Sequence, residues 1–102
     1  MLHLEETMKN VRENEVESYL VRRIEDLDGM CVKIDTVIGF PDRLVLLPNG
    51  RHLFVETKRP HGGRVSGAQL VQHMLLRRMG HLVEVVWDKA GVDALVESVR
   101  EK

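Results

Sequence analysis

The chain has 102 residues and a mass of 11.7 kDa, so we expect one domain spanning residues 1–102. Apolar residues make up 43% of it and charged residues 30%, a balance that excludes a disordered tail. No run approaches the roughly 20 apolar residues of a membrane-spanning helix. Cys31 is the only cysteine, which excludes an internal disulfide and a thiolate metal cage. We therefore expect a cytoplasmic protein without membrane contact.

Charge is distributed unevenly along the chain, although the net charge is only -1. Residues 1–28 hold four bases and eight acids, residues 29–82 hold eight and three, and residues 83–102 hold three and five. The near-neutral total argues against a general nucleic-acid coat. The basic middle segment, however, predicts one surface that can meet a polyanion.

The first half of the chain predicts a helix followed by three strands. Apolar residues recur at helical spacing between Glu13 and Leu27, and the glycine at position 29 is expected to end this helix. The β-branched run 30–38 and the apolar run 44–47 predict strands. A Pro-Asn-Gly turn at 48–50 then predicts a hairpin, whose second strand is 53–57.

The second half predicts a loop, a helix, a strand and a last helix. Residues 59–67 contain one proline and three glycines, which favours a loop. Ser66 and Gln69 form a capping-box pattern at the start of a helix that runs to Arg78. The buried stripe of this helix is expected to be Leu70, Met74 and Leu75. A strand is expected at 81–87, with Trp87 in the core, and a last amphipathic helix from 88 or 90 to 100.

This order predicts an α/β fold in which a mixed β-sheet is flanked by helices, as αβββαβ plus a C-terminal helix. Within it, Asp42 begins one hairpin strand and Glu56 lies near the end of the other. Antiparallel pairing places these carboxylates side by side, where they repel unless a cation lies between them. Hard divalent cations take such oxygen ligands. Lys58 points to the same face as Glu56, because side chains alternate along a strand.

A simpler interpretation of these three residues remains open. Glu56 and Lys58 are then an ordinary surface ion pair on an edge strand, and Asp42 caps the turn after Pro41. Against it, the apolar residues before Glu56 indicate a buried strand, and a buried charge requires a partner.

The series Gly39-Phe40-Pro41-Asp42, Glu56-Thr57-Lys58 and Gln69 on a helix resembles the VRR-NUC nucleases of the PD-(D/E)XK superfamily. The resemblance extends over nearly the whole chain. It implies a restriction-endonuclease-like core and an endonuclease that depends on Mg²⁺ or Mn²⁺ and uses no nucleotide cofactor. By the same resemblance Asp42, Glu56 and the backbone carbonyl of Thr57 bind the metal ion, and Lys58 orients or activates the attacking water.

The resemblance also implies an acid from the first helix and a supporting glutamine. The acid falls on Glu13, with Glu17 one turn later as the alternative. Gln69 is expected to hydrogen-bond the site lysine, a water or a DNA phosphate. Its rival role is local, because the last residue of a capping box can be used up on the helix backbone.

Arginine suits phosphate because its planar group donates two parallel hydrogen bonds. Contacts of this kind are blind to base sequence, and the chain has too few aromatic residues for a single-strand platform. We therefore expect a structure-selective nuclease that cuts branched DNA such as four-way junctions. The expected phosphate-binding residues are Arg43, Arg59, Arg64, His73 and Arg77, although a lone helix histidine is more often structural.

One small domain offers one active site, so we expect a homodimer that presents two sites to a junction. Compact members of the resembled family are typical of phages and bacteria, which places the protein in the cytoplasm of a bacterial cell or phage-infected host. Two alternatives remain: a non-catalytic nucleic-acid-binding module that kept the fold, and a sequence-specific restriction-type nuclease.

Overall fold

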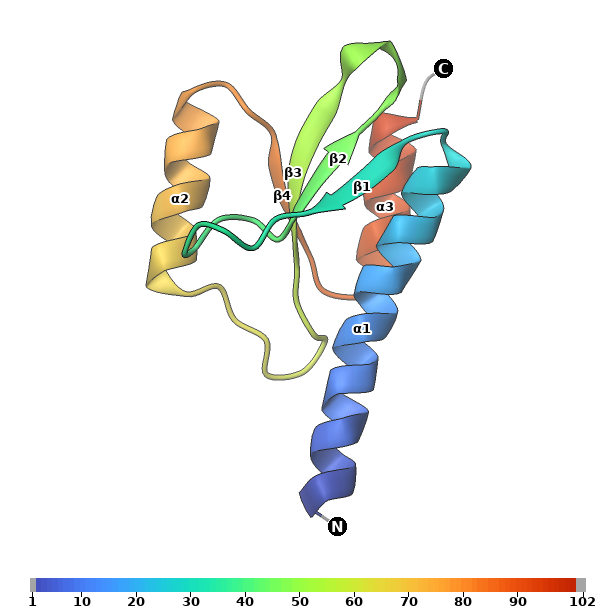
Figure 1. Ribbon diagram of the computed structural model, residues 1–102, viewed down its shortest axis with the longest axis vertical. Coiled ribbons are helices and arrows are strands. Elements are labelled where there is room, and N and C mark those ends of the chain that lie inside the picture. Colours follow the sequence, from blue (N-terminus) through green and yellow to red (C-terminus); the bar gives the residue numbers. More distant parts are fainter. Residues whose placement is uncertain (1, 101–102) are drawn as a thin grey trace.

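The computed structural model describes the backbone of residues 2–100 and the side chains of residues 14–100. Three helices and four strands follow one another in the predicted order (Figure 1). No helix among these residues is long and apolar enough to cross a membrane. The elements are α1 (Leu2–Asp26), β1 (Met30–Lys33), β2 (Arg43–Leu46), the short 3-10 turn η1 (Pro48–Gly50), β3 (His52–Thr57), α2 (Gly67–Arg78), β4 (Val83–Val86) and α3 (Lys89–Val99).

The four strands form one mixed sheet in the order β1-β2-β3-β4. The pairs β1–β2 and β2–β3 are antiparallel, whereas β3 and β4 run parallel and are connected through α2. A parallel pair needs such a crossover, because a short turn cannot return the chain to the starting edge. The predicted α/β fold with a mixed sheet is therefore confirmed.

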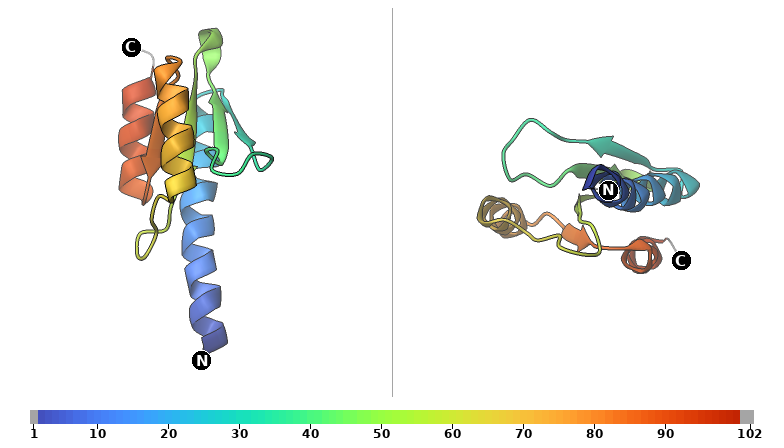
Figure 2. Two further views of the ribbon diagram at one scale, coloured as in Figure 1. Left: turned by 90° about the vertical axis from the view of Figure 1, so that its left-hand side faces the viewer. Right: turned by 90° about the horizontal axis from the view of Figure 1, so that it is seen from below.

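The core lies between one face of the sheet and the helices α1 and α3. In the part of α1 whose side chains are described, Val16, Leu20 and Ile24 recur every fourth residue and pack with inward-facing residues of β2, β3 and β4. Helix α2 lies on the opposite side of the sheet from α1 and α3 (Figures 1 and 2). The central buried cluster consists of Val16, Leu20, Ile24, Val45, Leu47, Leu53, Val55, Val86, Val92, Leu95 and Val96.

Two boundaries predicted in the first half of the chain are wrong. Helix α1 begins at Leu2, well before residue 13. Strand β1 ends at Lys33, although the β-branched run continues to Ile38. The ladder reaches one step further, since the Ile34 N–H donates to the Asp42 carbonyl at 2.8 Å. Beyond this bond the chain leaves the ladder for a turn, in which the Phe40 N–H donates to the Val37 carbonyl at 3.1 Å.

The expected buried stripe of α2 is also wrong. Leu70, Met74 and Leu75 are 58%, 53% and 41% exposed, and the buried residues of this helix are His73 and Leu76. The helix is rotated so that Gln69, one turn before His73, faces the sheet. Periodicity predicted the helix correctly but not which of its faces packs against the sheet.

The last strand is shorter and less buried than expected. Strand β4 spans Val83–Val86, and Trp87 lies beyond its end with 38% of its surface exposed, so the core placement of Trp87 is wrong. Within the strand Val83 and Val86 are buried, whereas Glu84 faces solvent. Helix α3 then begins after Asp88, whose side chain accepts from the Gly91 N–H at 2.7 Å as an N-cap.

Candidate active site

The hairpin brings Asp42 and Glu56 together as the sequence predicts. Arg43 is paired with Val55, so the residue before Arg43 and the residue after Val55 come opposite each other. Thr57 holds the Asp42 carboxylate in place: its N–H donates to Oδ1 at 3.1 Å and its hydroxyl donates to Oδ2 at 2.7 Å. Glu56 and Thr57 are only 4% and 2% exposed. The two carboxylates therefore lie side by side where β2 begins and β3 ends, with Glu56 buried and Asp42 half-buried.

Burial and mutual repulsion make both carboxylates hard to ionise. Burial, followed by the nearby charge of Asp42, raises the pKa of Glu56 to about 7, although Lys58 works against this. Burial also raises the pKa of Asp42, and the hydrogen bonds from Thr57 only partly oppose it. Within the described part of the chain, Glu56 Oε1 is buried without a hydrogen-bond partner. A buried oxygen of this kind is costly unless a cation or donor reaches it.

Lys58 and Gln69 complete a connected cluster around Glu56. The Lys58 ammonium lies 3.4 Å from Glu56 Oε2 and donates to Gln69 Oε1 at 2.9 Å. The Gln69 amide in turn donates to Glu56 Oε2 at 3.1 Å. The amide group of Gln69 therefore fixes the lysine and the glutamate at once.

Gln69 also performs the local role that the sequence left as an alternative. Its Oε1 accepts from the Ser66 N–H at 2.9 Å, and the Ser66 hydroxyl accepts from the Gln69 N–H at 3.2 Å. This is the predicted capping box. Because the side-chain oxygen accepts from both Ser66 and Lys58, the start of α2 and the position of the site lysine are coupled. The two roles are therefore not exclusive.

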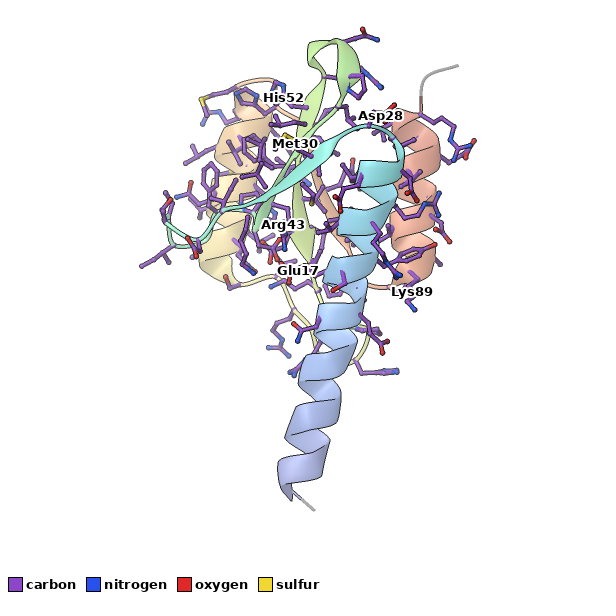
Figure 3. All side chains as sticks on the ribbon, turned by 45° about the vertical axis from the view of Figure 1, so that its right-hand side comes forward. Glu17, Asp28, Met30, Arg43, His52 and Lys89 are labelled. Carbon is purple, nitrogen blue, oxygen red and sulfur yellow. The ribbon has the colours of Figure 1, made fainter. Side chains whose placement is uncertain are left out.

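Of the two candidate acids on the first helix, Glu17 lies within the described side chains and Glu13 outside them. Glu17 accepts hydrogen bonds from Arg43 at 2.7 Å and Lys33 at 3.0 Å (Figure 3). Burial works against its ionisation, but these two donors outweigh it and hold the pKa of Glu17 below its usual value. Sequence reasoning missed this ion-paired group. The sequence signal that could have indicated it was Arg43, the basic residue directly after Asp42.

The expected phosphate-binding residues have different surroundings. Arg64 is exposed and Arg59 half-buried, both on the loop between β3 and α2, next to the site. Arg43 is committed to Glu17, and its other Nη donates to the Cys31 carbonyl at 3.0 Å. Arg77 is exposed but donates to the Val83 carbonyl at 2.8 Å.

His73 does not lie on the surface. Its side chain is 2% exposed and faces the sheet from α2, so it is a buried residue and not a surface contact for phosphate. Burial, followed by the charges of Arg77 and Lys58, lowers the pKa of His73. Its Nε2 is buried without a hydrogen-bond partner among the described residues.

A divalent cation fits the donor set of this site. The available ligands are hard carboxylate oxygens, one of them buried and without a hydrogen-bond partner, which suits an oxygen-seeking ion. Among the side chains from residue 14 to 100, no group of three or more His, Cys, Asp or Glu is placed to hold a metal. The site thus resembles those in which one or two carboxylates bind the ion and the substrate and waters supply the rest.

Fold and site together define a nuclease-type α/β protein, in which a hairpin presents the sequence Pro-Asp opposite Glu-X-Lys. A search against family profiles finds no match. The chain is 36% identical over 94 residues to "Putative nuclease p44" of Acyrthosiphon pisum secondary endosymbiont phage 1, covering 90% of this chain and 99% of that one. A solved structure named "VRR_NUC domain" superposes with a TM-score of 0.81 at 36% identity, covering 86% of this chain and 97% of the other. The chain belongs to the VRR-NUC family of nucleases.

Proposed function

We propose that the protein is a metal-dependent endodeoxyribonuclease that cuts branched DNA. The observation that carries the proposal is the buried Glu56 Oε1, which has no partner among the described residues and lies beside a second carboxylate and a lysine. Asp42, Glu56 and the backbone carbonyl of Thr57 are the residues that would hold Mg²⁺ or Mn²⁺. When bound, the ion supplies positive charge that stabilises the charge developing on the scissile phosphate.

The protein's own groups orient the reactants. Lys58, fixed by Gln69 at 2.9 Å, is placed to hold the attacking water by hydrogen bonding and to offset phosphate charge. Glu13 remains our candidate for the acid contributed by the first helix. Glu17 is occupied by Arg43 and Lys33, and this ion-paired group supports the start of β2 directly beside Asp42.

The proposed DNA surface is the loop between β3 and α2. Arg59 and Arg64 on this loop are the proposed phosphate contacts, which do not read bases. Such contacts select the shape of a nucleic acid instead of its sequence, which favours a branched substrate. Arg43 and Arg77 are held by Glu17 and by the Val83 carbonyl, so they are not part of this surface. The similarity to a phage nuclease supports a site of action in the cytoplasm of a bacterial cell or phage-infected host.

A second copy of the chain is the proposed occupant of the outer face of α2. Five large apolar side chains there are 41–67% exposed, an unusual amount for one short helix. About half of each side chain is already covered, so burying the rest contributes on the order of 1 kcal/mol per side chain, which together supports association. A twofold dimer would present two active sites to the two strands of a junction. The five residues are Leu70, Val71, Met74, Leu75 and Met79.

The dimer is tested by measuring molecular mass with sedimentation equilibrium. We expect Leu70→Glu to shift the mass from that of two chains to that of one, whereas Glu97→Lys, an exposed substitution on α3, leaves it unchanged. A wild-type protein that stays monomeric at high concentration would contradict this part of the proposal.

Cleavage is tested with labelled four-way junction, flap, single-stranded and linear duplex DNA, each with Mg²⁺, Mn²⁺ or EDTA. We expect cutting of the junction that requires a metal ion and disappears in Asp42→Asn. Binding without cutting would instead support the non-catalytic module. Discrete products from long duplex would support a sequence-specific restriction-type enzyme. A closed circular substrate distinguishes endonuclease from exonuclease activity.

A further inference from the structure

We propose that His52 and His81 form a second metal site, selective for a borderline transition ion of the Zn²⁺ type. His52 Nε2 and His81 Nδ1 lie 3.5 Å apart. Zn–N bonds are about 2.0–2.1 Å, so two nitrogens on a tetrahedral ion are roughly 3.3 Å apart. The two nitrogens, which without an ion are within hydrogen-bond distance of each other, therefore already have nearly the spacing that one ion requires.

Both imidazoles are attached to well-held backbone. His52 begins β3 and is paired with Leu46 of β2. His81 follows the turn that ends α2, and its N–H donates to the Leu76 carbonyl at 3.0 Å. The two segments are joined directly, because the Phe54 N–H donates to the Leu82 carbonyl at 2.8 Å. Little ordering remains to be done when an ion binds, which favours affinity.

The ring of Phe54 orients the His81 imidazole. The two rings meet edge to face, with centroids 5.8 Å apart at 86°. Phe54 is itself held by an edge-to-face contact with Phe40 at 5.5 Å. The His52 and His81 rings are tilted by 51° with centroids 5.6 Å apart, so they do not stack face to face.

This pair is separate from the candidate nuclease site. His52 begins β3 and Glu56 lies four residues further on, which is about 13 Å along a strand. Figure 3 likewise shows His52 well apart from Arg43 and Glu17. The ligands differ too, because imidazole suits Zn²⁺, Ni²⁺ and Cu²⁺, whereas carboxylates suit Mg²⁺. Two metal ions of different chemistry can thus be bound independently.

The site is open to solvent and has two protein ligands. His52 is exposed, and no third His, Cys, Asp or Glu of the described side chains joins the pair. Water or an outside donor would fill the remaining positions. An ion here would link the start of β3 to the turn between α2 and β4, and thereby tie down the helix that carries Gln69. Binding to the folded state alone raises the unfolding temperature.

The test uses the full chain carrying Asp42→Asn and Glu56→Gln, so that zinc cannot be held by the nuclease carboxylates. We expect Zn²⁺ to raise the thermal midpoint of this protein, and His52→Gln or His81→Gln to abolish the rise. His61→Gln is the matched control, because His61 is exposed on the neighbouring loop, and it should keep the full rise. Excess Mg²⁺ should not displace the zinc.

Imidazole nitrogen resonances locate the ion directly. On adding Zn²⁺, we expect the NMR signals of His52 Nε2 and His81 Nδ1 to shift together while those of His61 do not. A thermal rise that survives both His52→Gln and His81→Gln would overturn the proposal, as would zinc having no effect. Either result leaves the nuclease proposal untouched, since that site is disabled throughout.

Discussion

Replacing Glu56 by glutamine should stabilise the metal-free protein, by an amount that grows with pH. The carboxyl group is 4% exposed, and its pKa is raised from 4.5 to about 7, first by burial and then by Asp42. The folded state therefore resists losing this proton, whereas the unfolded chain loses it near pH 4.5. As pH rises between these values, wild-type stability falls. Glutamine stays neutral, so the stability of the variant does not fall with pH in this way.

The size of the effect follows from the shift. The difference between 4.5 and about 7 is about 2.5 units, and each unit is worth about 1.4 kcal/mol. The full cost is thus about 3 kcal/mol, reached at about pH 8. At about pH 5 only about 1 kcal/mol of it has developed, because this pH lies only about half a unit above the pKa of the unfolded carboxyl. Near-complete burial of the side chain leaves little screening by solvent to reduce it.

Urea unfolding in EDTA, monitored from about pH 5 to pH 8, measures this directly. The free energy of unfolding of Glu56→Gln should exceed that of wild type by a margin that widens with pH. Glu84→Gln is the control, because Glu84 is exposed on β4, and it should change stability by less than about 0.5 kcal/mol. Adding Mg²⁺ should stabilise wild type and not the variant, which narrows the margin.

A margin that is constant with pH, or a variant less stable than wild type at about pH 8, would refute this reasoning. The first result would mean that ionising Glu56 does not destabilise the folded state. The second would mean that its contacts with Lys58 and Gln69 outweigh the cost of burial. Either would remove the physical argument for a cation at this carboxylate.

Four further substitutions separate the roles of neighbouring residues. Lys58→Met should reduce the cleavage rate by about 100-fold or more while metal affinity, measured by calorimetry, changes little; an unchanged rate would contradict the role of the lysine. Gln69→Glu keeps the capping box but places a carboxylate where the amide donated to Glu56, so cleavage should fall, and the free energy of unfolding should fall with it as pH rises. Ser66→Ala should cost about 1 kcal/mol in urea unfolding with turnover retained. Gly39→Ala should cost about 2 kcal/mol or more, since φ is +83° and the added Cβ would lie 2.6 Å from a backbone oxygen of α2; a neutral result would contradict that close approach.

Short-range patterns in the sequence predicted several features of the site correctly. The capping box was readable because Ser66 and Gln69 are three residues apart on one helix turn. The meeting of Asp42 and Glu56 was readable because a short turn between two strands determines which residues face each other. In both cases the interacting groups are linked by a stretch of chain whose geometry is known.

Contacts between distant segments were not readable in this way. The pairing of Glu17 with Arg43 depends on how α1 packs across β2, and the approach of His52 to His81 depends on the parallel pairing of β3 with β4. The rotation of α2 is a third case. The apolar residues of α2 would allow more than one face of the helix to be buried. The face that is buried is the one that carries Gln69, which hydrogen-bonds Lys58 and Glu56.

The sequence by itself thus determined the order of helices and strands, the fold class, the family and the pair of facing carboxylates. Only the tertiary structure decided that Glu56 is buried with a raised pKa, that one glutamine both caps α2 and holds Lys58, and that the outer face of α2 remains apolar and exposed. The physical reason is that periodicity and turns act over a few residues. Burial and charge depend on every segment that packs around a group.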